Sequence, residues 1–513
     1  MAATGATLQY PGAQPHAPDG FVAPSPARRA RLPYGWPIYA LFGGFPLWWF
    51  LGLGAFIWPV LAVPMAFSLL TRARLRVPRG FGLYLLFLIW MLASALQING
   101  PDRMIGFAYR SSLYFSAGIL CLYVYNAPKR LLPTSTVVKT MLGFWCIVVG
   151  GGLLGVLMPT LEFATLAERL VPQRLLANEF VYTLVHPTTA QIQTFLGYDV
   201  PRPRAPFVYT NDWGGVFSLL VPFVIAGWNQ IRQLGRRNLL KALALVSLVP
   251  VIFSLNRVLW VCIVLALIYG SLRFALRGRP GAVQGILAIG IVFLMIFSFG
   301  PARQLIEDRV ATNHSANART TLYGEALAGV SEQPFLGYGA PRPSETNPNL
   351  PSVGTQGQFW LVLYSHGIPA AVFFVGFLVY SLWRSRRARS PMALWCHVVV
   401  LVALAQMLFY GLIPTQLHLI MIAVALAGRE MTWPDTKPET KVVAVAPTPP
   451  AGGRTQAAYD VPAAVGNGHG SGNGHNYKDG HKNGYKNGNG NGAGHDDGWG
   501  WGPSGHRQGG APA

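Results

Sequence analysis

The sequence is poor in charged residues. Only 12% of its 513 residues are Asp, Glu, Lys or Arg, and 51% are hydrophobic, whereas about a quarter of the residues in a soluble domain are charged. This shortage excludes an ordinary soluble globular domain. Several apolar runs reach the roughly 20 residues that cross a bilayer, and helices are the expected spans because backbone polar groups in lipid must be satisfied internally.

Cysteine is scarce as well. The four cysteines all fall inside apolar runs, where cysteine behaves as a small hydrophobic residue. These positions exclude a disulfide framework, and the sequence contains no C-x-x-C metal motif. The four are Cys121, Cys146, Cys262 and Cys396.

Acidic residues are the rarest charged class, with 19 Asp and Glu against 40 Lys and Arg. None of them lies deep within an apolar run, although a proton-coupled transporter usually carries ionisable groups in mid-membrane. The net charge of +21 invites a nucleic-acid interpretation, so the location of the basic residues matters. Residues 430–513 hold seven charges of each sign, and the whole excess therefore lies in the first 429 residues.

The apolar runs divide into about twelve predicted spans. With the N-terminus inside, the cytoplasmic segments up to Arg429 hold twenty-two Lys and Arg and one acidic residue, whereas the outer segments hold eleven of each. Because Lys and Arg accumulate in cytoplasmic loops, this asymmetry predicts an N-in, C-in protein. The basic excess is then a topology signal that also favours contact with anionic lipids, and it implies no nucleic acid. Ten spans are expected at about 81–96, 111–126, 136–158, 212–228, 239–254, 257–272, 281–300, 357–383, 392–410 and 412–427, and two more divide the run 36–70 near residues 52–54.

Three parts follow along the chain. Residues 1–33 form a predicted cytoplasmic tail, and residues 34–428 an all-α polytopic transmembrane helical bundle with large extracytoplasmic loops at 159–211 and 301–353. Residues 429–513 are rich in Gly, Asn and His. Such a composition cannot bury enough apolar surface to fold, which predicts a disordered cytoplasmic tail.

Three arginines on the predicted outer side are candidate anion ligands. Arg204 precedes a span, Arg257 follows the tight turn Leu255-Asn256, and Arg319 opens an amphipathic helix pattern that ends in the turn Q-P-F-L-G-Y-G. Arginine grips phosphate oxygens with a planar fork of donors and stays charged where the dielectric constant is low. The alternative is that each arginine extends to lipid headgroups or pairs with an outer carboxylate.

Four segments in order carry a family resemblance. They read R-A-P-F-V-Y-T-N-D-W-G at 204–214, S-L-N-R-V-L-W at 254–260, A-R-T-T-L-Y-G-E-A-L with Q-P-F-L-G-Y-G at 318–339, and Q-F-W-L-V-L-Y-S-H-G-I-P-A-A at 358–371. In this order the set resembles the O-antigen ligase/polymerase superfamily of polytopic membrane glycosyltransferases. The resemblance covers about residues 200 to 380.

The resemblance implies a function as well as a fold. Such enzymes transfer glycan from a polyprenyl-diphosphate carrier to a glycan or lipid-glycan acceptor, on the outer face of the bacterial cytoplasmic membrane and among its lipids. They need no metal and no other cofactor. By motif, Arg204, Arg257 and Arg319 would hold the diphosphate, whose departing negative charge fixed guanidinium groups stabilise.

The sequence departs from this family at one position. Ligases of the family carry a His-Asn pair where this chain reads Gln356-Gly357, and a glutamine side chain cannot act as the proton acceptor. Either another group is the base, or the reaction runs with little base assistance, or the protein is not a ligase of that type. His366 lies well inside a predicted span, which is more typical of a packed histidine. The candidate bases are His314, Glu325, Glu345 and His366.

Two other functions stay open at this point. A transporter or flippase of a lipid-linked or anionic solute can use arginines in its cavity, although the lack of mid-membrane carboxylates disfavours proton coupling. A membrane scaffold whose Gly-rich tail recruits partners is the third possibility. Between ligase and polymerase, the sequence favours neither.

Overall fold

The computed structural model describes residues 32–193, 199–228, 230–231, 233–278, 290, 314–347 and 350–432. All of them belong to one compact unit, Met1–Thr440, and the second unit, Lys441–Ala513, lies outside the described residues. Apart from residues 32–33 and 429–432, the predicted tails fall outside them, as does the predicted span 281–300 apart from Gly290. The predicted start of the C-terminal tail at residue 429 is wrong, because α19 continues to Thr432 and Arg429 is buried.

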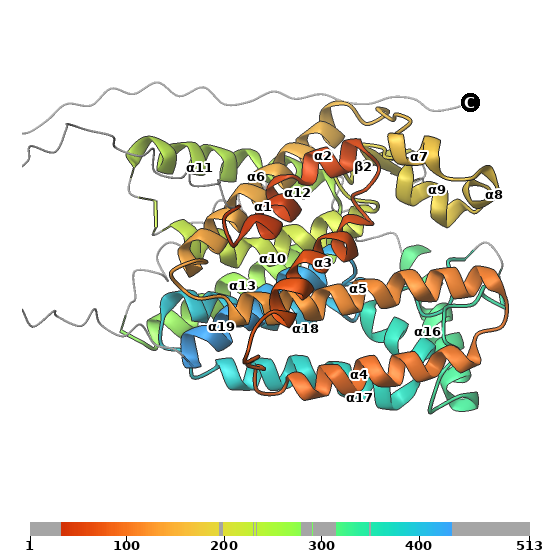
Figure 1. Ribbon diagram of the computed structural model, residues 1–513. Helices are drawn as coiled ribbons and strands as arrows, with labels where there is room; N and C mark the ends of the chain where they lie inside the picture. Colours follow the sequence, from red (N-terminus) through yellow and green to blue (C-terminus); the bar gives the residue numbers. More distant parts are fainter. Residues whose placement is uncertain are drawn as a thin grey trace, which may run out of the picture. The chain divides into compact units, whose positions relative to one another are not determined.

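The described chain is mostly helical, as predicted (Figure 1). Up to the first strand, the elements are α1 (Trp36–Gly43), α2 (Phe45–Phe50), α3 (Ile57–Leu70), α4 (Phe81–Ala93), the 3-10 helix η1 (Ser94–Gln97), α5 (Pro101–Asn126), α6 (Thr134–Leu157), α7 (Leu166–Leu170), α8 (Gln173–Leu176) and α9 (Glu179–Val185). The remainder are β1 (Ala190–Gln193), β2 (Val200–Pro203), α10 (Thr210–Trp228), α11 (Leu234–Val246), α12 (Leu248–Phe253), α13 (Arg257–Ala275), α16 (His314–Glu332), α17 (Gln358–Ser385), α18 (Pro391–Gln406) and α19 (Thr415–Thr432).

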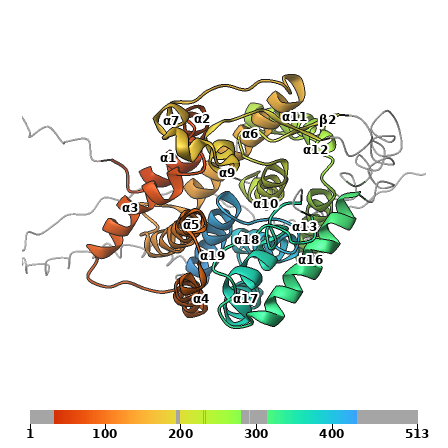
Figure 2. The same ribbon diagram turned by 90° about the vertical axis from the view of Figure 1, so that its right-hand side faces the viewer.

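Helix α19 lies at the centre of the bundle. Every side chain from Thr415 to Ala427 is buried, and the helix packs against α5, α10, α17 and α18, as the end-on view shows (Figure 2). A helix that is apolar all round is expected in a core rather than on a surface. Its sequence, with Ala at several positions, lets the neighbouring helices approach closely.

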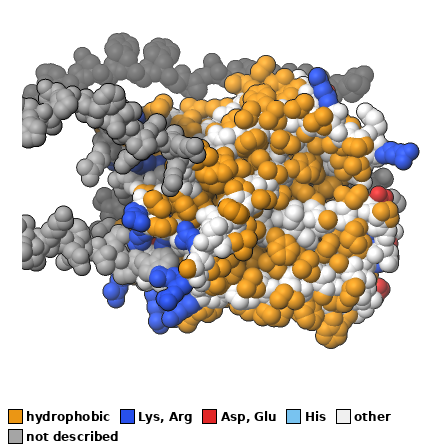
Figure 3. Space-filling view, viewed as in Figure 1, with side chains coloured by type: hydrophobic (Ala, Val, Ile, Leu, Met, Phe, Trp, Pro, Cys, Tyr) orange, Lys and Arg blue, Asp and Glu red, His pale blue; other side chains and the backbone are white. Residues whose placement is uncertain are grey.

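The flank of the bundle is covered by large apolar side chains (Figure 3). On α3 alone, Val63 is 68% exposed and Phe67 is 69% exposed. Within the described ranges, four helices are long and apolar enough to cross a membrane, namely α5, α6, α13 and α17, and α3, α4 with η1, and α18 are shorter apolar helices. A continuous apolar surface of this kind indicates a helical membrane protein.

The long apolar run 36–70 divides where the sequence predicts. Gly52, with a φ of 75°, turns the chain between α2 and α3. A Cβ atom there would lie 2.2 Å from Oγ1 of Thr165, so only glycine fits this turn. The prediction of a break near residues 52–54 is confirmed.

One predicted loop is wrong. Residues 97–110 are predicted to connect two spans, but residues 101–110 form the first turns of α5, which begins at Pro101. Proline suits the first turn of a helix because its missing N–H would have no partner there. The charged residues in this stretch made it resemble a loop in the sequence. They face a polar cavity, described below, which explains why charged residues occur in this helix.

The polar segment 159–211 has its own structure. It contains α7, α8 and α9 and an antiparallel hairpin in which Gln191 of β1 pairs with Arg202 of β2. These short helices and α16 lie at the end of the bundle where α5 and α17 begin (Figure 1). We call this the cavity end.

Candidate functional site

A cavity of about 1210 Å³ lies at the cavity end. Its wall includes the first residues of α5, α10 and α13 and the residues that lead into α17 and α19. Each helix N-terminus carries a partial positive charge and N–H groups without partners inside the helix. The convergence of these N-termini favours a negatively charged ligand.

Charged side chains reinforce this preference. The wall holds six arginines and three carboxylates, an excess of positive charge in a partly enclosed space. The arginines are Arg103, Arg110, Arg174, Arg202, Arg257 and Arg319, and the carboxylates are Asp102, Glu179 and Asp212.

Arg257 is placed at the cavity by a tight helix start. Asn256 caps α13 by accepting a hydrogen bond from the backbone N–H of Leu259 at 3.4 Å, and Leu255 takes a positive φ of 47°. Asparagine is a favoured N-cap residue because its side-chain oxygen satisfies an otherwise free donor. The S-L-N-R segment therefore fixes Arg257 as the first residue of α13, in the cavity wall.

Arg319 reaches the same cavity from α16. Its side chain hydrogen-bonds to Tyr323 one turn later, and the Tyr323 ring stacks on Trp360 of α17 with the ring centroids 4.3 Å apart. The helix predicted at this position is confirmed as α16. The structure thus brings Arg257 and Arg319, from distant parts of the sequence, to one cavity.

The turn after α16 anchors that helix to α17. The backbone N–H of Tyr338 donates to the carbonyl of Tyr364 at 3.1 Å, and that of Gly339 donates to the carbonyl of Ser365 at 2.7 Å. Gly337 and Gly339 have positive φ values of 60° and 73°, which glycine adopts without strain. The Q-P-F-L-G-Y-G segment is therefore the structural support that positions Arg319.

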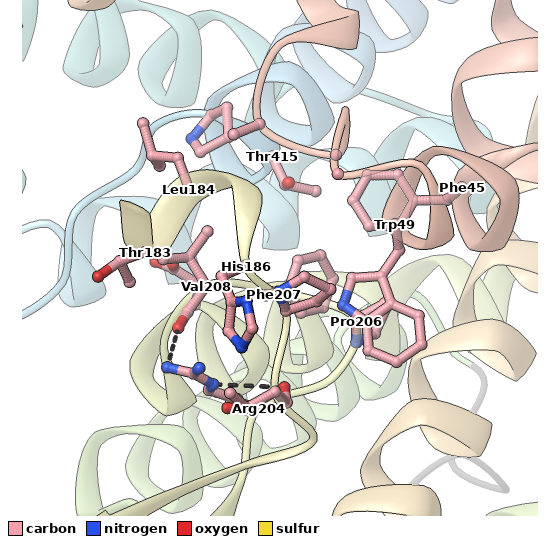
Figure 4. Close-up of a pocket in the computed structure, with 17 residues that line it drawn as sticks. Phe45, Trp49, Thr183, Leu184, His186, Arg204, Pro206, Phe207, Val208 and Thr415 are labelled. Carbon is pink, nitrogen blue, oxygen red and sulfur yellow. Dashed lines mark hydrogen bonds between the residues drawn. The ribbon is translucent and has the colours of Figure 1, made fainter. Parts of the chain in front are cut away.

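Arg204 is not brought into this cavity. It lines a smaller adjoining pocket (Figure 4), where its Nη1 donates to the carbonyl of Val208 at 3.1 Å and its Nε donates to the carbonyl of Thr188 at 3.3 Å. Burial lowers the pKa of the Arg204 guanidinium, while Tyr209 and Glu162 oppose the shift. Two carbonyl partners make Arg204 a structural link between loops.

Arg110 was missed by the sequence reasoning. It lies inside α5 and lines the large cavity, with its guanidinium carbon 5.5 Å from the ring centroid of Phe180. An ionisable residue within a membrane helix is by itself an indication of function, and that signal was available. The sequence did not identify Arg110 as a residue within a membrane helix because residues 97–110 are predicted to form a loop.

The carboxylate of Asp212 was also overlooked. It lies in the first turn of α10, lines both the large cavity and the adjoining pocket, and accepts a hydrogen bond from Nε2 of Gln416 at 3.3 Å. Its position between the two spaces shows that they are neighbours.

The predicted bases lie elsewhere. Burial pushes the pKa of Glu325 upward, but hydrogen bonds from Thr346, Ser344 and the backbone of Glu345 lower it overall, and a lowered pKa makes a poor proton acceptor. His366 is 3% exposed and its Nδ1 lies 2.7 Å from Oγ of Ser94. The cavity wall includes neither Glu325 nor His366. His314 begins α16, and its side chain lies outside the described residues.

Gln356 does line the cavity, next to Gly357. A Cβ atom on Gly357 would lie 2.5 Å from the carbonyl oxygen of Leu408, so the asparagine of the family pair does not fit here without a shift of the backbone. The packing around Gly357 therefore accounts for the absence of the asparagine of the His-Asn pair.

Neither a metal-binding cluster among the described residues nor a comparison with known proteins assigns a ligand to this site. In the part of the chain that the structure describes, no group of three or more His, Cys, Asp or Glu side chains is arranged to hold a metal ion. Comparison of the sequence with protein-family models and with curated proteins finds no match.

Proposed function

We propose that this is a bacterial membrane glycosyltransferase that transfers or polymerises glycan from a polyprenyl-diphosphate carrier onto an acceptor hydroxyl. The observation that carries the proposal is the convergence of Arg257 and Arg319 on one cavity of about 1210 Å³ at which several helices begin. A diphosphate presents several charged oxygens to bidentate donors and helix N-termini, and both bind it well.

The size and surroundings of the cavity suit such a donor. Ligand sites for drug-sized molecules occupy about 300 to 1000 Å³, so a cavity of about 1210 Å³ has room for a diphosphate and attached sugar units. The flank of the bundle is apolar (Figure 3). The polyprenyl chain would lie along that flank in the lipid while its diphosphate enters the cavity.

The chemistry needs stabilisation of a leaving group. The acceptor oxygen forms a bond to the anomeric carbon, and the bond between that carbon and the phosphate oxygen breaks. The electron pair leaves with the diphosphate, and the hydroxyl proton passes to a base. Arg257 and Arg319, with Arg110, would stabilise the charge that develops on the diphosphate, and stabilisation of this kind often contributes more to catalysis than any other effect.

Charge distribution supports the predicted orientation. On the face drawn in Figure 3, a cluster of Lys and Arg side chains lies at the end opposite the cavity, and acidic side chains lie at the cavity end together with a few Lys or Arg side chains. Because basic residues favour the cytoplasmic side, the cavity would face the outer side of the cytoplasmic membrane. Lipid-linked glycans are used on that side.

Removal of the protein from its cells tests the proposal. We expect lipid-diphosphate-linked glycan to accumulate and mature surface polysaccharide to be lost. Polymer stranded on its lipid carrier would identify a ligase, and single repeat units on the carrier would identify a polymerase. Unchanged surface polysaccharide with no accumulated intermediate would refute the proposal.

Transport of the same lipid is the competing function. The bundle is closely packed next to the cavity-wall residue Gly357: Gln358 donates to the hydroxyl of Tyr114, and its Oε1 accepts a hydrogen bond from the backbone N–H of Leu412 at 2.9 Å. Passage through the bundle would require this buried network to open. Reconstituted liposomes separate the two functions, since a transporter moves the lipid-linked glycan across the bilayer without consuming it.

A further inference from the structure

A small pocket adjoins the large cavity. Its volume is about 40 Å³, which holds two or three water-sized groups at about 10 to 15 Å³ each. The pocket and the cavity share five wall residues, which shows that they are continuous neighbours. These are Thr183, Leu184, Val208, Asp212 and Pro414.

The pocket contains an oriented histidine. His186, whose side chain is 13% exposed, directs Nδ1 toward Oε2 of Glu168 at 2.9 Å. The Tyr182 ring stacks on the imidazole with the centroids 4.7 Å apart. A carboxylate on one ring nitrogen fixes the tautomer and leaves the other nitrogen, Nε2, as a proton acceptor.

Glu168 is itself held in place. It forms a capping box with Thr165 at the start of α7: the backbone N–H of Glu168 donates to Oγ1 of Thr165 at 3.1 Å, and that of Thr165 donates to Oε2 of Glu168 at 3.2 Å. The Oγ1 of Thr165 also donates to the carbonyl of Val185, next to His186, at 2.7 Å. These hydrogen bonds hold both Glu168 and the backbone next to His186, so the imidazole has a fixed orientation.

The pocket wall also includes a tryptophan. Trp49 is 8% exposed and lines the pocket (Figure 4), and its Nε1 has no hydrogen-bond partner among the described residues. A buried N–H without an acceptor costs about 1 to 3 kcal/mol. Because this atom has almost no accessible surface, it does not contact a group in the pocket, and the proton acceptor that the pocket wall offers is His186.

We propose that this pocket receives the acceptor hydroxyl of the glycosyl transfer and that His186 is its general base. The inference rests on the proposed function. The hydroxyl gives its proton to Nε2 of His186 as its oxygen bonds to the anomeric carbon. The leaving diphosphate takes the electron pair of the broken bond. His186 supplies the base that Gln356 cannot, and Glu168 is a positioning residue.

The size of the pocket fits this division of labour. It is too small for a sugar ring but large enough for a hydroxyl or hydroxymethyl group. The ring of the acceptor sugar then stays in the large cavity, next to the donor, while its reactive hydroxyl enters the pocket.

Several charged or titratable groups surround the imidazole and bear on its pH dependence. Glu168 bonds Nδ1, and Oε2 of the exposed Glu162 lies 3.8 Å from Nε2, beyond hydrogen-bond distance. Tyr182 covers the ring, and Arg204 and Asp212 line the same pocket. A general base works only in its unprotonated form, so the transfer rate should fall as pH decreases.

The test uses the full-length protein in liposomes of phosphatidylethanolamine and phosphatidylglycerol. The donor is the lipid-diphosphate-linked glycan that accumulates in cells lacking the protein. His186→Ala should slow transfer about 100-fold and abolish the acid limb of the pH–rate profile. Glu168→Gln should slow transfer about tenfold and move the acid limb to lower pH, because glutamine has no charge to favour the imidazolium.

Binding measurements and a control separate the possible failures. Both variants should bind undecaprenyl diphosphate as the wild type does, and Glu345→Gln, the same change at an exposed position outside both the cavity and the pocket, should alter transfer less than about twofold. If His186→Ala also loses binding of undecaprenyl diphosphate, the shift of the acid limb in Glu168→Gln tests the assignment of the base instead. Wild-type transfer rates in His186→Ala, or an unshifted acid limb in Glu168→Gln, would overturn the assignment of the base alone. A wild-type protein that transfers no glycan would overturn the proposed function as well.

Discussion

The two ends of the bundle use arginine in different ways. At the end opposite the cavity, helices α5 and α17 finish, and their carbonyls lack partners inside the helix. Arg72 donates there to the carbonyl of Asn126, Arg273 to that of Arg386 and Arg277 to that of Ala388. These guanidinium groups complete the ends of helices.

At the cavity end, the same helices present N–H groups instead. A helix N-terminus cannot accept a hydrogen bond from a guanidinium, and its partial positive charge adds to that of the arginine. Arg257 and Arg319 therefore raise the positive potential of the cavity wall. The comparison teaches that the three arginines at the opposite end satisfy carbonyls at or near helix ends. At the cavity end, Arg103 and Arg202 also donate to backbone carbonyls, whereas Arg257 and Arg319 add positive charge beside helix N-termini.

The largest effect is expected when one arginine is changed at each end of the same helix, which tests the difference between the two ends directly. Arg257→Lys removes the planar fork at the cavity end of α13, and we expect glycan transfer to fall about 100- to 1000-fold. Arg319→Lys should behave similarly. Arg273→Lys, at the other end of α13, is the matched control and should leave transfer within about twofold. Initial rates in proteoliposomes with lipid-diphosphate-linked glycan provide the measurement.

Arg110 extends the comparison of the two ends to an arginine in the cavity wall that lies inside α5 rather than at its start. If it faces the diphosphate, Arg110→Gln should weaken binding of undecaprenyl diphosphate about tenfold or more, as expected for loss of one charged hydrogen bond. The salt dependence of binding should also become shallower. Unchanged affinity and salt dependence would place Arg110 outside the diphosphate site.

Arg429 tests the opposite end. It is fully buried on α19 and donates to the carbonyl of Leu132 at 3.0 Å and to Oγ1 of Thr134 at 2.7 Å. Arg429→Met should lower the free energy of unfolding by about 1 to 3 kcal/mol, because buried acceptors lose their donor. Thermal unfolding in detergent measures this loss. Affinity for undecaprenyl diphosphate should not change in the variant that stays folded, and a selective loss of affinity would argue against a purely structural role.

The smallest expected effect concerns Glu325, which accepts hydrogen bonds from Ser344, Glu345 and Thr346 at the cavity end. Burial opposes these bonds, yet the folded pKa is lowered. The carboxylate therefore stabilises the fold above its unfolded pKa, and the stabilisation is lost as pH falls through the lower folded pKa. Glu325→Gln should unfold at a slightly lower temperature than the wild type at pH 7. The difference should shrink as pH falls below the unfolded pKa of about 4.3 and vanish once the carboxylate is protonated in the folded protein as well. A constant difference would contradict this role.

Much of the local structure could be predicted from the sequence. The turn at Gly52, the tight turn before Arg257 and the helix of Arg319 are all set by residues close in the chain, through glycine conformation, an asparagine cap and helical periodicity. These signals are local, so a single sequence contains them. The start of α5 was missed because its charged residues face a cavity that other segments build.

The site depends on contacts between distant segments. Arg204 and Arg257 look alike in the sequence, each just before or at the start of a span, yet Arg204 finds two carbonyls in its own loop region. His186 stands in a loop with no motif around it, and only folding brings Glu168 to its Nδ1. The orientation of the bundle, its twelve spans and its membrane remain predictions.

The most direct test of the central claim is the affinity of the reconstituted protein for undecaprenyl diphosphate in two double variants. One carries Arg257→Lys and Arg319→Lys at the cavity end, and the other carries Arg273→Lys and Arg277→Lys at the opposite end. We predict saturable binding by the wild type, loss of binding in the first variant and wild-type affinity in the second. Equal affinity in all three proteins, or equal loss in both variants, would contradict an anion site at the cavity end.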